Sequence, residues 1–423
     1  MTDLIEELEW RGLIQQHTDL EELRKAFASG PVTYYCGFDP TAPSLHHGHL
    51  VQLVLMRHLQ LAGNRPLALV GGATGLIGDP RDVGERSLNS TEVVEEWASR
   101  LRGQIESFLD FDGDNPAQMV NNLEWIGSMS AIDLLREIGK YFRVGTMLSK
   151  DVVARRLASD EGISYTEFSY QVLQGTDYLE LFRRRGCTLQ TGGNDQWGNL
   201  VAGADLIRKV EGKSVHLLTT PIVTKADGTK FGKTSGGAIW LDPKMMSPYD
   251  FYQFWLRTDD ADVVKMLKIF TFLDRQTIGE LEVSSLERPH LREAQKALAA
   301  EVTKMVHGKD AFDQVVLASE ALWGSGDLRS VDGSTLRSAA AHLPSATVEL
   351  GKSTVVDAML GSGLEHGRQA ALRTVKQGGV YLNNEKVQDP DQVISCDDLL
   401  PGGFALLRKG KKTLAALVPV QPQ

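Results

Sequence analysis

Two short polar motifs, far apart in the sequence, carry the residues best suited to chemistry. The first is His46-His47-Gly48-His49, which follows a turn after the run Gly37 to Thr41. Histidines three residues apart share one face of a helix's first turn, where the partly positive N-terminus suits a polyphosphate. The second is the Gly-rich run Asp227 to Thr234, with two lysines and a hydroxyl. Together they predict a nucleotide held between a helix end and a mobile basic loop.

Each motif also has a plainer interpretation. Clustered histidines can bind a metal, but no cysteine or acidic ligand is adjacent, and a solvated surface cluster is more common. The second motif nearly spells the phosphate loop Gly-x-x-x-x-Gly-Lys-Thr. However, Asp227 occupies the place of the first glycine and would repel a phosphate. Without the first motif, a surface turn would explain the second equally well.

The composition is that of an ordinary globular protein of two or three domains. The chain has 423 residues, 42% of them hydrophobic, and a net charge of −10, which argues against a protein that coats nucleic acid. Its three cysteines are far apart and fit neither a disulfide framework nor a zinc site. Neither a secretory signal nor a long apolar run is present, so we expect a cytoplasmic location and no membrane partner.

Strands alternate with helices through the first 240 residues. The expected strands are 32–38, 66–72, 119–122, 188–191 and 215–219, and the expected helices are 46–61, 91–109 and 168–185. This alternation predicts an α/β domain with a parallel, Rossmann-type sheet. Polar and Gly-rich clusters follow the strands, at the edge where open α/β sheets bind ligands.

The rest of the chain predicts three further parts. Helical patterns dominate residues 241–323, and a Ser-, Gly- and Ala-rich stretch at 324–351 is the candidate linker. Residues 352–423 predict a small α+β domain with two short helices, 354–360 and 368–377, and a hairpin at 378–387. This last part carries nine Lys/Arg against seven Asp/Glu, so any contact with RNA must be local.

In this order, the motifs resemble those of the bacterial tyrosyl-tRNA synthetases, a family of class I aminoacyl-tRNA synthetases, over nearly the whole chain. The histidines stand at the family's His-Ile-Gly-His type signature, and Lys230 to Thr234 at its Lys-Met-Ser-Lys-Ser type loop. The run Gly193 to Asn199 lies between them and also matches. The resemblance implies activation of L-tyrosine by ATP to tyrosyl-adenylate and pyrophosphate, then transfer to the 3′-terminal ribose of tRNA(Tyr).

This chemistry needs positioning and charge stabilisation rather than a nucleophile. The attacking carboxylate is already ionised at neutral pH, so catalysis requires cations and hydrogen-bond donors near the leaving phosphates. The proposed catalytic residues are Thr41, His46, His49, Lys230, Lys233 and Thr234. Gly228 and Gly232 would let the loop close on the pyrophosphate in the transition state.

The resemblance also assigns binding residues and partners. For tyrosine it implies Tyr35 and Asp177 at the phenol, Asp79, Tyr170 and Gln174 at the ammonium group, and Gln196 near the carboxylate. For ATP it implies Gly37, Asp39, Gly48, Gly193, Asp195 and Lys233, and for tRNA it implies Arg368, Arg373, Lys376 and Lys386. ATP is expected as a substrate accompanied by Mg²⁺, with no protein-bound metal. A homodimer is expected through an insertion at about residues 90–187.

Two positions depart from the family pattern. His47 replaces an apolar residue and faces the packed side of its helix, so its ring needs a partner or water. The loop after Asp79 lacks a lysine that many relatives use on phosphate, and Arg81 and Arg86 are the alternatives. Three rival functions remain: a tryptophanyl-tRNA synthetase, a P-loop-type NTPase with an RNA-binding tail, and an inactive RNA-binding relative.

Overall fold

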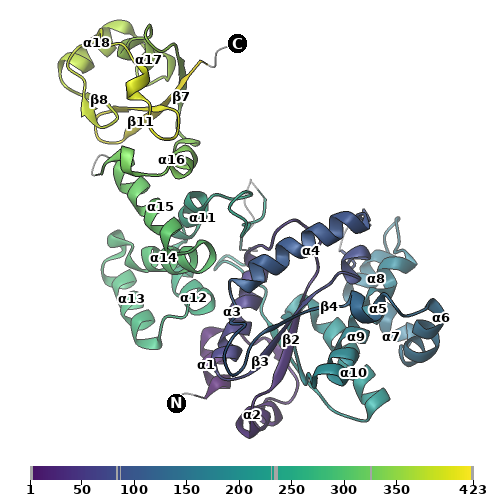
Figure 1. The fold of residues 1–423 in the computed structure, drawn as a ribbon. Coiled ribbons are helices and arrows are strands. Elements are labelled where there is room, and N and C mark those ends of the chain that lie inside the picture. The colour runs from purple at the N-terminus through teal and green to yellow at the C-terminus, as the bar shows by residue number, and fades with distance from the viewer. Residues whose placement is uncertain are drawn as a thin grey trace. The chain divides into compact units, whose positions relative to one another are not determined.

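The fold is taken from a computed structural model that describes residues 3–81, 84–85, 87–229, 231–232, 237–323 and 326–420. The chain divides into two compact units. Unit 1 comprises Met1–Met245 and Thr258–Leu298, and unit 2 comprises Met246–Arg257 and Ala299–Gln423. Figure 1 shows their helices and strands, and each unit is described by itself below.

Unit 1 is built on a six-stranded sheet in the order β1-β6-β5-β2-β3-β4. Its strands are β1 (Gln16–His17), β2 (Thr33–Phe38), β3 (Arg65–Val70), β4 (Gln118–Asn121), β5 (Leu189–Gly193) and β6 (His216–Thr220). All neighbours pair in parallel except β1, which is antiparallel to β6. The expected α/β class is confirmed. β1 was not predicted, because two residues carry no pattern.

Helices cover both faces of this sheet. They include α3 (His47–Leu61), α4 (Thr91–Glu106), α9 (Tyr165–Arg185) and α10 (Trp197–Glu211). The chain runs from β2 to β4 in one direction across the sheet and from β5 to β6 in the other. Right-handed crossovers therefore place α3 and α4 on one face and α10 on the other, as Figure 1 shows. Consecutive buried residues in β2, Tyr34 to Cys36, fit a strand covered on both sides.

Shorter elements complete unit 1. They are α1 (Leu4–Arg11), α2 (Leu20–Ser29), η1 (Thr74–Leu76), α5 (Leu123–Ile126), α6 (Ala131–Asp133), η2 (Leu134–Ile138), η3 (Gly139–Tyr141), α7 (Val144–Leu148), α8 (Asp151–Leu157), η4 (Asn194–Gln196), α12 (Asp260–Phe270), α13 (Arg275–Glu287) and η5 (Pro289–Leu291). The buried Arg11 guanidinium joins α1 to the end of α12. It donates to the carbonyls of Lys268, Thr271 and Leu273 at 3.1, 2.8 and 2.7 Å. These bonds satisfy carbonyls that a helix end otherwise leaves without partners.

A buried ion pair holds the segment that follows η1. Arg156 on α8 donates to Glu167 on α9 at 2.8 Å, and both side chains are almost completely buried. The same guanidinium donates to the carbonyls of Arg81 and Gly84 at 3.2 and 2.7 Å. One cation therefore fixes the loop after Asp79 against two helices.

Unit 2 contains helices and a five-stranded sheet in the order β7-β11-β10-β8-β9. Its elements are α11 (Pro248–Leu256), α15 (Lys309–Leu322), η6 (Leu328–Ser330), α16 (Gly333–Ala340), β7 (Ser345–Val348), α17 (Val355–Gly361), α18 (Arg368–Lys376), β8 (Val380–Leu382), β9 (Glu385–Lys386), η7 (Cys396–Asp398), β10 (Ala405–Lys409) and β11 (Thr413–Pro419). The division between the units falls within α14 (Glu293–His307). Leu406 packs with α15 and α16, whereas the next residue, Leu407, packs with α17 and α18. The period-two alternation of a strand thus buries both faces of the sheet.

The C-terminal elements were predicted in part. The two helices at 354–360 and 368–377 are present as α17 and α18. The hairpin is present as β8 and β9, with Asn383 and Asn384 at φ of 48° and 69° in its turn. The segment predicted as a linker contains α16 and β7, and β7 pairs in parallel with β11. Both elements are short and rich in Ser and Ala, so their apolar pattern is faint.

Candidate functional site

The first motif forms the N-terminus of α3, just beyond the carboxyl end of β2. His46 is the N-cap, and its Nδ1 accepts from the Gly48 N–H at 3.1 Å. The His49 Nδ1 accepts from the His46 N–H at 3.2 Å, and the two rings stack with centroids 4.0 Å apart. Burial, and then the nearby His46 and His47, hold the pKa of His49 well below its ordinary value. A ring that accepts at Nδ1 carries its proton on Nε2, so both imidazoles are neutral donors at a helix N-terminus.

The second motif approaches the same helix end. The His47 Nε2 lies 2.9 Å from the Phe231 carbonyl oxygen. Beyond residues 233–236, the His47 N–H donates to the Ile239 carbonyl at 2.9 Å, and His46 forms a β-bridge with Trp240. The described residues on both sides of 233–236 therefore contact the N-terminus of α3. Lys230, Lys233 and Thr234 themselves lie outside the described residues.

Helix α12 fixes the start of this loop. Asp262, buried on α12, accepts from the Ala226 N–H at 2.7 Å, and the Lys265 ammonium donates to the Thr224 carbonyl at 2.9 Å. The buried Phe231 ring lies 6.3 Å from that of Phe270. The segment that leads to the lysines is thus attached to a helix as well as to the histidines.

A buried polar group lies where α9 meets β2 and the residues after β4, and we call the region around Tyr35 and Asp177 the slot. The carboxylate of Asp177 accepts from Trp125 Nε1 at 2.8 Å and from Asn122 Nδ2 at 3.1 Å. Burial raises the pKa of Asp177 to about 8, although these two hydrogen bonds act in the opposite direction. The buried hydroxyl of Tyr35 has no hydrogen-bond partner among the described residues. Burial, and then the charge of Asp177, raise the pKa of Tyr35 well above its ordinary value.

Asp39 connects this slot to the nucleotide edge of the sheet. Its two carboxylate oxygens accept from the Tyr170 hydroxyl and the Thr74 hydroxyl, both at 2.6 Å. Thr74 in turn accepts from Asn122 at 3.0 Å. A Cβ at Gly71 would lie 1.9 Å from the Asp39 Oδ1, so only glycine leaves room for these bonds. Burial and the neighbouring Asp39 raise the pKa of Tyr170.

Asp79 and Gln196 meet at a second polar group. The Gln196 amide donates to the Asp79 Oδ2 at 2.9 Å, and Asn199 donates to Oδ1 at 3.2 Å. Burial raises the pKa of Asp79. The hydrogen bond from Gln196 and the charge of the nearby Lys150 act in the opposite direction and offset part of this rise. Gln174 lies one helical turn before Asp177 on α9, and its buried Oε1 has no partner among the described residues. These groups supply both charges that an amino acid's ammonium and carboxylate require.

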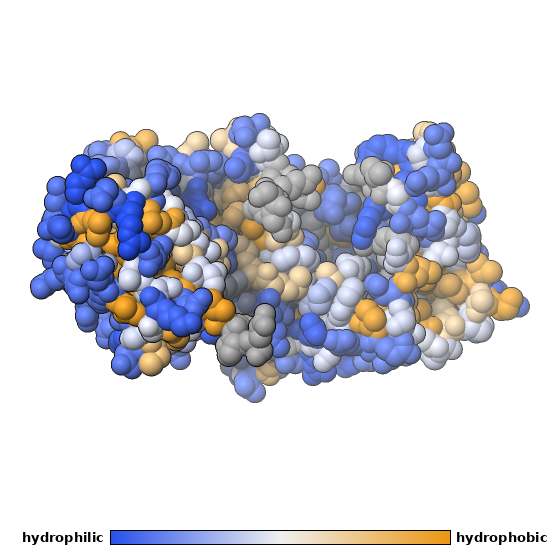
Figure 2. Space-filling model, turned by 90° about the horizontal axis from the view of Figure 1, so that it is seen from above, coloured by the Kyte–Doolittle hydropathy of each residue, from blue (hydrophilic) through white to orange (hydrophobic). Residues whose placement is uncertain are grey.

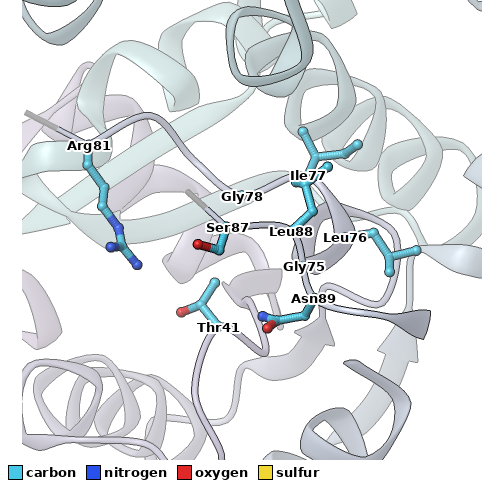
Figure 3. A pocket seen from close by; sticks show the side chains of 9 residues that line it. All are labelled: Thr41, Gly75, Leu76, Ile77, Gly78, Arg81, Ser87, Leu88 and Asn89. Carbon is cyan, nitrogen blue, oxygen red and sulfur yellow. The ribbon is translucent and has the colours of Figure 1, made fainter. Parts of the chain in front are cut away.

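The remaining residues predicted to bind the nucleotide lie at or near the ends of strands. Gly37 is in β2, Gly193 ends β5, Asp195 is in η4, and Gly48 is in the first turn of α3. Thr41 lines a pocket of about 30 Å³ together with Arg81, Ser87 and Asn89. Figure 3 shows these polar side chains around it. Arg86 lies outside the described residues.

The four residues predicted for tRNA belong to unit 2. Arg368, Arg373 and Lys376 are exposed on α18, and Arg368 pairs with Asp357 at 2.9 Å. The exposed Lys386 on β9 lies over Gly378, just beyond the end of α18, because a Cβ built at Gly378 would be 2.3 Å from its ammonium. The four cations therefore share one helix and the adjoining strand.

Sequence reasoning missed several polar residues of the site. Asn122 and Trp125 hold Asp177, Thr74 holds Asp39, and Asn199 and Lys150 lie at Asp79. Asn122 directly follows the last residue of β4, at the strand end where open α/β sheets bind ligands, and could have been found by that rule. Lys150 belongs to the insertion, where no local signal indicates a site.

Comparisons with known proteins agree along the whole chain. The family described as "tRNA synthetases class I (W and Y)" matches residues 28–324, and "Tyrosine--tRNA ligase SYY-like C-terminal domain" matches residues 335–417. The tyrosine–tRNA ligases of Streptomyces avermitilis and Streptomyces griseus are each 59% identical over 99% of both chains. A solved C-terminally truncated mitochondrial tyrosyl-tRNA synthetase from Coccidioides posadasii is 31% identical, with a TM-score of 0.66 over 74% of this chain and 91% of that one.

No helix in the described ranges has the length and apolar character needed to span a bilayer. In the same ranges, no three His, Cys, Asp or Glu side chains gather closely enough to bind a metal ion.

Both domain families match this chain, and the two Streptomyces relatives named above are identical to it at more than half of their positions. The chain therefore belongs to the tyrosine–tRNA ligases, a family of class I tRNA synthetases.

Proposed function

We propose that the chain joins L-tyrosine to ATP as tyrosyl-adenylate and then transfers tyrosine to the 3′-terminal ribose of tRNA(Tyr). One observation supports it above the others. The residues that flank the lysine segment contact the histidine turn of α3, at the sheet edge that also holds the slot of Tyr35 and Asp177. Cations for the phosphates and a site for an aromatic amino acid thus occur together.

The slot suits a phenol. The unpartnered Tyr35 hydroxyl can donate to the phenolic oxygen, while Asp177 accepts the phenolic hydrogen. An indole N–H could satisfy only Asp177 and would leave Tyr35 unpaired, which favours tyrosine over tryptophan. Asp79, Tyr170 and Gln174 then bind the ammonium group, and Gln196 lies near the carboxylate.

The nucleotide would lie along the strand ends. The Nε2–H groups of His46 and His49 donate to ATP, and Lys230, Lys233 and Thr234 stabilise charge on the leaving pyrophosphate. Thr41 and Arg81, which share one small pocket, add a hydroxyl and a cation, and Arg81 takes the place of the missing loop lysine. Mg²⁺ would arrive bound to the phosphates of ATP, as this ion usually does.

The insertion offers a surface for a second copy of the chain. Ile132, Val144 and Tyr165 are 70%, 60% and 71% exposed, and Leu135 and Leu157 are about half exposed. Figure 2 shows hydrophobic side chains over the end of unit 1 where Figure 1 places α6 and α7. Apolar side chains gathered in this way are typical of a subunit interface, so we propose a homodimer through the insertion. Sedimentation of the wild type beside an Ile132→Glu/Val144→Glu variant would test it: a monomeric wild type would exclude the dimer.

Pyrophosphate exchange into ATP, measured with each of the twenty amino acids, tests the activity itself. Exchange should occur with tyrosine alone. Lys233→Ala should slow it by about 10²- to 10³-fold, the scale for losing one transition-state charge contact, while tyrosine affinity stays nearly unchanged. Hydrolysis of ATP without any amino acid would instead indicate an NTPase, and exchange with tryptophan would exclude the phenol slot.

A further inference from the structure

His47, the residue that departs from the family's apolar pattern, contacts the lysine loop directly. Its ring is 8% exposed, and its Nε2 lies 2.9 Å from the Phe231 carbonyl oxygen. Its centroid is 6.0 Å from that of the Phe231 ring, with the planes at 74°. Because a carbonyl oxygen only accepts, Nε2 carries the proton of the ring. An apolar side chain could fill the same space but could not donate to this carbonyl.

The backbone of the next residue passes close over the imidazole. Gly232 has a φ of +78°, and a Cβ built on it would lie 2.2 Å from the His47 Cε1. No side chain fits between the two, and the left-handed conformation also favours glycine. Any side chain at position 232 would therefore clash with the His47 ring.

We propose that His47 is a positioning residue that holds the lysine loop in place for adenylate formation. The Nε2–H bond fixes the backbone at Phe231, which lies between the two lysines in sequence. The group around Asp177 comes from α9 and the residues after β4, whereas the His47 ring bonds to Phe231. Losing the bond should therefore slow chemistry and leave tyrosine binding intact. The inference rests on the proposed role of Lys230 and Lys233.

Two substitutions separate hydrogen bonding from packing. His47→Val keeps an apolar filling and should slow tyrosine-dependent pyrophosphate exchange by about tenfold, the scale of one lost hydrogen bond with a buried partner. His47→Gln restores an N–H donor and should recover most of that rate. Tyrosine affinity, measured by calorimetry, should stay within about twofold in both, since the bond is made to the loop and not to the slot.

His58→Val is the matched control, because it removes a histidine from the other end of the same helix. The His58 ring packs on Phe272 with centroids 4.6 Å apart, and its Nε2 has no hydrogen-bond partner among the described residues. It should leave the exchange rate unchanged. A slow His58→Val variant would mean that any disturbance of α3 lowers the rate, and would overturn the specific role of His47.

A double-mutant cycle tests the geometry. Gly232→Ala should slow exchange strongly in the wild type and less so beside His47→Ala, because the smaller side chain removes the clash. Additive effects would show that the ring and the loop do not meet.

Lys233→Ala is measured in parallel: a normal rate in that variant would refute the proposed function of the loop. A slow Lys233→Ala beside a normal His47→Val would overturn the positioning role alone. Equal loss of exchange and tyrosine affinity in His47→Val would make His47 merely structural.

Discussion

At the residue scale, the unusual feature is the completely buried carboxyl of Asp177. Asp177 has a pKa of about 8 against an ordinary 3.8, chiefly because it is buried. Between these pH values the native chain keeps a proton that the unfolded chain has lost. This carboxyl therefore contributes most stability below pH 3.8, and the contribution disappears as the pH rises to about 8.

The affinity for tyrosine should rise with pH, whereas the contribution of Asp177 to stability falls. The phenolic hydrogen needs an ionised Asp177, so binding below pH 8 must displace a proton from the carboxyl. We expect the affinity for tyrosine to rise by up to about tenfold per pH unit towards pH 8 and then to level off. Calorimetry in buffers of different ionisation enthalpy would measure the released proton. Asp177→Asn should bind weakly and without this slope, and a flat profile in the wild type would contradict the assignment.

The variant Trp125→Phe tests how much the hydrogen bond from Trp125 stabilises the ionised form of Asp177. It removes the Nε1 donor and keeps a ring, so Asp177 loses one of the two bonds that favour its charge. The affinity for tyrosine should fall by about tenfold at pH 7, the usual effect of a lost hydrogen bond to a charged group. The loss should shrink at higher pH, where Asp177 is ionised in both proteins. A loss that stays constant with pH would point to altered packing.

At the element scale, the parallel strands and their helices could be predicted from the sequence, because buried runs such as 34–36 and 50–56 leave a clear apolar pattern. The site residues Asp79 and Asp177 were assigned through the resemblance to the family. Trp125 and Lys150 were missed because no family motif marks either of them. The partners of their side chains are set by tertiary packing alone.

The insertion also supplies the ion pair that holds the loop after Asp79. Arg156→Met would remove the cation beside the buried Glu167 and the donor to the carbonyls of Arg81 and Gly84. Breaking one side of a buried pair costs about 3–5 kcal/mol, so thermal unfolding should begin markedly earlier. Arg155→Met, at the exposed neighbouring position, should cost less than about 1 kcal/mol. Equal effects of the two would show that the buried pair contributes nothing.

At the scale of the whole molecule, unit 2 packs as one body around its sheet. Removing residues 352–423 would expose Leu322 and Leu336, which pack against the sheet, and would leave β7 without a neighbour. Point substitutions on α18 therefore test RNA binding more cleanly than a deletion. The strands β10 and β11 were not predicted, because two buried faces leave no alternation in their sequence.

The variant Arg368→Gln/Arg373→Gln/Lys376→Gln should separate the two half-reactions. Pyrophosphate exchange with tyrosine should stay normal, because these residues lie outside unit 1. Aminoacylation should show a KM for tRNA raised by about tenfold or more, with a weaker dependence on salt, as lost phosphate contacts require. Lys411→Gln/Lys412→Gln, on the exposed turn between β10 and β11, is the control and should leave both reactions unchanged. A normal KM in the triple variant would exclude α18 from the interface.

The Arg11 side chain gives the first residues of the chain an influence far along the sequence. It closes the final turn of α12, and that helix carries Asp262 and Lys265, which anchor the approach to the lysines. A shortened protein that begins at Leu13 would therefore lose more than a peripheral helix. It would destabilise the C-terminal turn of α12, the helix that binds the residues leading to the lysines. Removing the N-terminal residues should therefore lower the turnover rate before it lowers the affinity for tyrosine.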